Sequence, residues 1–176
     1  MAAIITAGAM AYAADATHTP GATIAQAIPG AQRVGQGRLN WLGLGIYDAS
    51  LWAAPGLTQL EFDRREFALE LSYLRSLRGA DIARRSIDEM RRTEGMGPAQ
   101  AQRWAGQLQA LFPDVAAGDR ITGVHRPGRG AMFFVNGKPA GEIADAEFSR
   151  RFFGIWLAVT TSEPGLRAQL FGATPP

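Results

Sequence analysis

The chain has 176 residues, of which 47% are hydrophobic and 19% are charged, and such a chain is long enough to bury one sizeable core in a single domain. The formal net charge is only +2, far from the dense basic surface that is typical of nucleic-acid-binding proteins. Cysteine is absent, which excludes disulfides, thiolate nucleophiles and zinc–thiolate sites.

The first fourteen residues are apolar and rich in small side chains, and the sequence Ala-Tyr-Ala at positions 11–13 fits a signal-peptidase site. We therefore expect residues 1–14 to be the remnant of a secretory signal peptide, with an ordinary N-terminal helix or strand as the alternative. Residues 15–22 are expected to form a flexible leader and residues 23–176 a single domain. No other stretch reaches the roughly 18 apolar residues of a spanning helix, so we expect a periplasmic or secreted protein without a membrane span.

The first half of the domain predicts strands. Residues 23–34 predict a weak first strand. Residues 38–52 predict two strands that meet near Gly43, where glycine permits a bend. In residues 66–73, every second residue from Phe67 onward is apolar, which is the pattern of an antiparallel strand with one buried face.

Two helices are predicted next. The first has an apolar stripe that starts after Asp81, and the second begins at Pro98, because proline suits the first helical position, and ends before Pro113. The arginine pairs on the first helix indicate a solvated face more strongly than an anion site, since Asp88 and Glu89 lie beside them. These arginines are Arg84, Arg85, Arg91 and Arg92.

A hairpin is the strongest local signal in the second half. Residues 119–125 and 131–135 predict two strands, and the second ends at an Asn-Gly pair, residues 136–137. Asn-Gly favours a two-residue hairpin turn because both positions tolerate positive φ. Residues 138–143 predict the return strand, which contains Pro139 and is therefore expected at an edge of the sheet.

A helix follows this hairpin. Asp145 has the position of an N-cap, and Phe148, Phe152 and Ile155 then recur at helical spacing. A short helix is predicted over residues 164–171. Because strands are grouped with helices and do not alternate with them, the order predicts an α+β fold in which helices cover one face of an antiparallel sheet.

Catalytic motifs are sparse. Of the two histidines, His18 lies in the predicted leader and His125 near the end of a predicted strand. A metal site or a Ser-His-Asp triad needs several convergent groups, so neither is expected. The Gly-x-Gly pairs at residues 35–37 and 128–130 are too short for a dinucleotide-binding loop. We expect no cofactor and no metal.

A binding function has more support than a catalytic one. Arg38 begins the strand that leads to Tyr47, and Tyr73 and Arg75 end a later strand. An arginine at the edge of an apolar cavity can bind a carboxylate while the cavity buries a hydrocarbon tail. The alternative, which the pattern alone favours, is that these arginines face solvent and the tyrosines fill the core.

The chain resembles the chalcone isomerase-like family in three blocks. These are residues 37–52 with a Gly-Ile-Tyr signature, residues 71–75 followed by a helix, and residues 118–158 with the Asn-Gly hairpin and aromatic helix. The resemblance implies the open-faced sandwich of the chalcone isomerase fold, in which helices cover one face of an antiparallel sheet.

The resemblance also implies a choice of functions. Plant chalcone isomerases cyclise a chalcone, whereas related plant proteins of this fold are not enzymes and bind fatty acids through an arginine and a tyrosine. By this resemblance Arg38 is the candidate for the early arginine, and Ser149 matches a Ser/Thr near the substrate cleft. Leu42 stands where the catalytic threonine is expected, and Gly79 and Ala80 where the catalytic tyrosine is expected.

These departures favour a non-catalytic, exported protein that binds a small amphipathic ligand such as a fatty acid. One alternative is an isomerase or intramolecular lyase that acts on an unsaturated ketone. Another is a partner-binding module of the cell envelope, which would show a filled core and an exposed apolar patch. The candidate ligand-binding residues are Arg38, Tyr47, Tyr73, Arg75 and Ser149.

Overall fold

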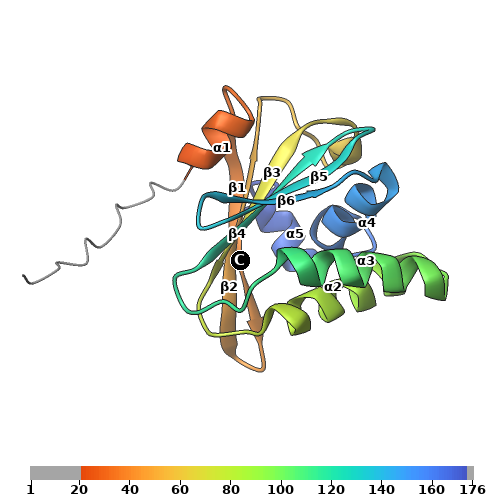
Figure 1. Cartoon of the computed structure of the whole chain (residues 1–176). Helices are drawn as coiled ribbons and strands as arrows, with labels where there is room; N and C mark the ends of the chain where they lie inside the picture. Colours follow the sequence, from red (N-terminus) through yellow and green to blue (C-terminus); the bar gives the residue numbers. More distant parts are fainter. Residues whose placement is uncertain (1–20, 174–176) are drawn as a thin grey trace, which may run out of the picture.

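The structure is a computed structural model that describes residues 21–173, so the predicted signal peptide lies outside the described residues. Its six strands form one sheet in which each strand pairs antiparallel with its neighbour in sequence (Figure 1). This arrangement confirms the predicted α+β class with an antiparallel sheet. The strands are β1 (Gln32–Trp41), β2 (Leu44–Ala53), β3 (Phe67–Tyr73), β4 (Arg120–Arg126), β5 (Gly130–Val135) and β6 (Lys138–Ile143).

Most of the helices cover one face of this sheet, while the first helix lies on the opposite face (Figure 1). None of the helices within residues 21–173 is long and apolar enough to cross a bilayer. The helices are α1 (Ala22–Ala27), α2 (Gly79–Thr93), α3 (Pro98–Leu111), α4 (Ala146–Leu157) and α5 (Pro164–Leu170), with a 3₁₀ turn, η1 (Phe62–Arg64), before β3.

The strand predicted over residues 23–34 is wrong for its first part. The chain forms α1 there, starting at the last residue of the predicted leader, and β1 begins only at Gln32. Ile24 and Ile28 are four positions apart, a helical spacing that buries both on one side. They pack on a second, smaller core with Ala68, Val124 and Phe134.

The main core lies between the sheet and α2 to α5. The alternation in β3 is confirmed, since its four odd-numbered residues from Phe67 to Tyr73 all belong to this core. Pro139 lies in β6, which is an edge strand as predicted. Asn136 and Gly137 form the turn between β5 and β6 with φ of 49° and 78°, the left-handed values that such a turn requires.

The last helix packs closely on the first strand. A Cβ atom at Gly35 of β1 would lie 2.2 Å from the carbonyl oxygen of Gln169 and 2.5 Å from that of Leu170 in α5. Both distances are well inside van der Waals contact, so only glycine lets the helix backbone approach the strand here.

We expect Gly35→Ala to lower the free energy of unfolding by roughly 1–3 kcal/mol, because the added methyl group must displace the α5 backbone. The control is Gly106→Ala in α3, where a Cβ would meet nothing within 4 Å. That substitution should raise stability by up to about 1 kcal/mol, since alanine is the better helix former. Urea unfolding of the two variants measures both effects, and an unchanged stability in Gly35→Ala would contradict the close packing.

Candidate functional site

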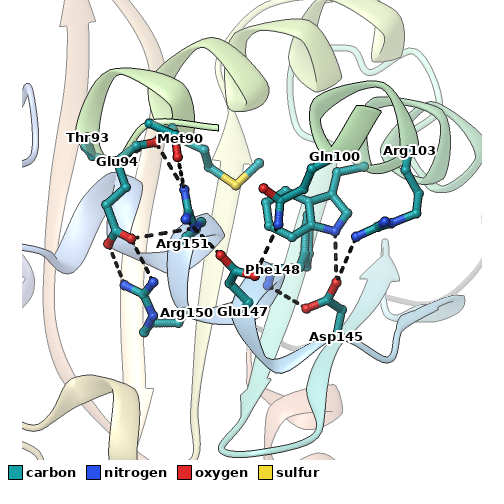
Figure 2. A network of polar contacts seen from close by, with 12 residues as sticks. Met90, Thr93, Glu94, Gln100, Arg103, Asp145, Glu147, Phe148, Arg150 and Arg151 are labelled. Carbon is teal, nitrogen blue, oxygen red and sulfur yellow. Dashed lines mark hydrogen bonds and ion pairs between the residues drawn. The ribbon is translucent and has the colours of Figure 1, made fainter. Parts of the chain in front are cut away.

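The position of α4 is fixed by Asp145, the residue directly before the helix. Asp145 is the N-cap, as predicted, and its carboxylate accepts a hydrogen bond from the Phe148 backbone N–H at 3.0 Å. The same carboxylate accepts from Nε1 of Trp104 in α3 at 3.0 Å (Figure 2). One side chain therefore begins α4 and joins it to α3.

Charged side chains extend this joint to α2. Glu94, the residue after α2, accepts from Nη2 of Arg150 in α4 at 2.8 Å. Glu147 of α4 pairs with Arg151 at 2.8 Å and accepts from Gln100 of α3 at 3.1 Å (Figure 2). The three helices are thus held together at one edge by polar contacts.

A cavity of about 380 Å³ lies on the helical side of the sheet, enclosed by α2 and α4. Its volume and largely apolar lining are typical of a small-molecule site. The apolar lining comes from Leu39, Ile46, Leu69, Leu71, Leu77, Ile82, Phe112, Ile121, Phe133, Phe152, Phe153 and Ile155.

Two tyrosine side chains line this cavity. Tyr47 and Tyr73 are cross-strand partners in β2 and β3, and their rings meet edge to face with centroids 5.9 Å apart. The Tyr47 hydroxyl accepts a hydrogen bond from Nε1 of Trp156 at 2.8 Å. The Tyr73 hydroxyl makes no hydrogen bond within residues 21–173.

Both tyrosines remain protonated. Burial raises the pKa of Tyr47 and of Tyr73 far above the ordinary value of 10. Because the Trp156 indole is only a donor, the Tyr47 hydroxyl proton is still available, as is that of Tyr73. The cavity therefore holds two hydroxyl donors that suit a ligand carbonyl or carboxyl oxygen.

The charged groups that line the cavity come from α2 and from Glu163, the residue before α5. Glu89 is largely buried and accepts from Arg92 at 3.0 Å and from Ser162 at 3.1 Å. It also pairs with Arg85 at 2.8 Å, while Arg84 pairs with Asp81 at 2.8 Å. The arginines that line the cavity are therefore already neutralised by carboxylates.

The predicted carboxylate anchor, Arg38, is not among the residues that line the cavity. Its guanidinium forms a bidentate pair with Asp48, with Nε–Oδ1 and Nη2–Oδ2 distances of 2.6 and 3.0 Å. Leu39 and Tyr47, the neighbouring pair in the ladder, face the cavity, so Arg38 faces the opposite side of the sheet. Arg75, which lies after β3, is likewise not part of the cavity wall.

Ser149 also lies outside the cavity wall, contrary to its predicted place near the cleft. It is buried in α4, and its hydroxyl lies 2.7 Å from Nδ1 of His125. The Nε2 atom of His125 lies 3.0 Å from the Asp63 carbonyl oxygen, which can only accept. Nε2 therefore carries the proton and Nδ1 accepts from Ser149, so this pair ties η1 to α4 in the core.

Tyr47 and Tyr73 were both predicted as site residues and both line the cavity. The residues on the opposite side of the cavity were not predicted. Ser86 and Glu89 of α2, together with Trp156 of α4, line the cavity. The helical spacing of α2 showed a polar face, yet nothing in that spacing indicates that part of the face borders a cavity. Within residues 21–173 no cluster of three or more potential ligands could hold a metal ion.

The chain matches the sequence profile of the family described as chalcone isomerase-like over residues 37–172. An uncharacterized protein of Haemophilus influenzae is 30% identical over 143 residues, which cover 81% of this chain and 69% of that relative. The crystal structure of a fatty-acid binding protein of Arabidopsis thaliana superimposes with a TM-score of 0.61 and 12% identity, over 81% of this chain and 87% of that chain. The structural likeness confirms the predicted chalcone isomerase-like fold.

The His125 environment predicts a dependence of stability on pH. Burial lowers the pKa of His125 below its ordinary value of 6.5, so protons bind the unfolded chain first. The stability that comes from the neutral ring is complete above pH 6.5 and is lost as the pH falls below it. We expect the melting temperature to fall between pH 7.5 and pH 5, and to fall less in His125→Gln, which is less stable at both values. Calorimetry measures the melting temperatures of both proteins at each pH. An equal fall of the melting temperature with pH in the two proteins would contradict the role of His125.

Proposed function

Because the chain belongs to the chalcone isomerase-like family, we propose that it is a non-catalytic binding protein for a small amphipathic ligand such as a fatty acid. The observation that carries this proposal is the apolar cavity of about 380 Å³ between the sheet, α2 and α4, which is within the size range of small-molecule sites. The structural neighbour from Arabidopsis is a fatty-acid binding protein, in keeping with this ligand class.

We assign the polar end of the ligand to the two tyrosines. Tyr47 and Tyr73 offer hydroxyl protons inside the cavity, whereas Arg38 pairs with Asp48 on the other face of the sheet. A neutral carboxyl or carbonyl group that accepts from both hydroxyls needs no buried cation, because no net charge is desolvated. The hydrocarbon tail then lies against the aliphatic and phenylalanine side chains of the cavity wall.

We also propose that the protein is exported to the periplasm or secreted. The support is the apolar, small-residue composition of residues 1–14 with its Ala-Tyr-Ala sequence. Expression of the full chain in a Gram-negative host, followed by periplasmic extraction and N-terminal sequencing, tests this localisation. A chain that begins near residue 14 in the periplasmic fraction is the expected result, and an uncleaved chain confined to the cytoplasm would contradict it.

The ligand class is tested by denaturing mass spectrometry of an organic extract from the purified protein. We expect a stoichiometric amphipathic molecule, or a rise in melting temperature with at least one member of a C8–C18 fatty-acid series. A clean extract and no thermal shift across the series would contradict the proposed function.

Single substitutions separate the parts of the site. Tyr73→Phe removes only a hydroxyl, and we expect it to weaken fatty-acid affinity about 2- to 10-fold, since one hydrogen bond contributes roughly 0.5–1.5 kcal/mol. Arg38→Ala is the control and should leave affinity unchanged. If Arg38→Ala weakens binding and Tyr73→Phe does not, the head group lies with the arginine.

A bulky substitution tests whether the cavity itself is the site. Leu71 lines the cavity and is buried, so Leu71→Trp should fill it and abolish fatty-acid binding. Leu60→Trp makes the same change at a residue that is 86% exposed, and it should bind like the wild type. Circular dichroism checks that Leu71→Trp is folded. A folded Leu71→Trp that still binds would place the ligand elsewhere.

A further inference from the structure

Three large hydrophobic side chains are exposed together at one end of the sheet. Trp41 is 66% exposed, Leu42 81% and Leu44 52%, and these three form the end of the β1–β2 hairpin. The backbone N–H of Leu74, after β3, donates to the Ile46 carbonyl at 2.9 Å, so the segment after β3 runs beside this hairpin. We name residues 41, 42 and 44 the apolar tip.

The turn at this tip carries a residue that its backbone does not favour. Leu42 and Gly43 have φ of 50° and 77°, nearly the values of Asn136 and Gly137 in the β5–β6 turn. Asparagine suits the left-handed region, whereas a larger side chain without a local hydrogen bond is disfavoured there. Because Leu42 is also exposed, neither the turn nor the core accounts for a leucine at this position.

The apolar tip adjoins the cavity. Trp41 and its neighbour Asn40 line the cavity on one side, and Arg84 and Arg85 line it on the α2 side. Figure 1 shows the β1–β2 tip beside the loop that leads from β3 into α2. A surface that covered the tip would therefore lie at the entrance of the cavity.

Positive charge accompanies the tip. Residues 74–89 contain four arginines and three acidic residues, and Arg85 is neutralised by Glu89 at 2.8 Å. Arg78 and Arg84 share the Asp81 carboxylate, at 3.0 and 2.8 Å, and Arg75 forms no ion pair within residues 21–173. Exposed apolar and tryptophan side chains beside a basic segment are the combination that binds an anionic lipid surface.

We propose that the apolar tip inserts into the surface of an anionic lipid bilayer, so that the cavity entrance faces the membrane. Leu42 and Trp41 would enter the interface while Arg75 meets the lipid head groups. The docking is argued from the exposed residues alone, whereas exchange of an amphipathic ligand with the membrane rests on the proposed function.

Vesicle flotation tests the docking with the full chain and vesicles of phosphatidylglycerol and phosphatidylcholine. We expect wild-type protein to float with the vesicles and Leu42→Asn to bind at least about tenfold more weakly, because a leucine that would enter the lipid interface is replaced by a polar residue. Leu42→Asn should not melt below the wild type, since asparagine suits this turn. Leu60→Asn, at another exposed leucine, should float like the wild type. All variants contain residues 1–20, so any contribution of that segment to flotation is the same in each.

Fluorescence gives a second measurement. Vesicles should shift the emission of wild-type protein to shorter wavelength, and Trp41→Phe should lose most of the shift. Trp104 and Trp156 are buried already, and the half-buried Trp52 pairs with Arg33 at the other end of β2. Undiminished flotation of Leu42→Asn would overturn the proposal. So would self-association of the wild type that Leu42→Asn abolishes without any vesicle binding, since a second copy would then cover the tip. Fatty-acid binding measured without vesicles reports on the proposed function separately.

Discussion

The anchoring of α4 by Asp145 is the interaction on which the site depends. Its carboxylate caps the helix at Phe148 and binds the Trp104 indole, so the start of α4 is fixed against α3. The first turns of α4 fill the core with aromatic rings, while its last turn presents Trp156 to Tyr47 across the cavity. A helix fixed at one end can leave space under the other end without losing its place in the fold.

The distribution of charge around this space follows from the cost of desolvation. The ionised groups of the lining come from α2, where Glu89 is satisfied by Arg85, Arg92 and Ser162, and from Glu163 before α5. The interior polar groups are neutral hydroxyls, which cost less to bury than a cation and still donate hydrogen bonds. Such a lining suits a ligand that has an apolar chain and one acceptor group.

Most elements of the fold were predictable from local sequence patterns, whereas features that depend on the register between strands were not. The alternation in β3, the Asn-Gly turn and the α4 cap each depend on a few adjacent residues, and each was predictable. The place of Arg38 depends on one extra residue, Ile46, which forms a bulge between two ladder pairs and aligns Arg38 with Asp48 instead of Tyr47. A bulge reverses which face a side chain occupies, and no signal in the sequence marks it. Helix α1 was not predicted because its six residues are too few to show a helical period that differs clearly from that of a strand.

The contact between α5 and β1 and the β1–β2 tip differ in how their apolar residues are placed. Where α5 meets β1, Gly35 lets backbone pack on backbone, and Leu166 and Leu170 are buried. At the β1–β2 tip, large apolar residues are exposed and Leu42 holds a conformation that glycine or asparagine would adopt more easily. Proteins retain such local costs where function requires them, provided that the remaining structure supplies enough stability. The exposed tip is such a local cost, and close contacts such as that between α5 and β1 supply part of the stability that offsets it.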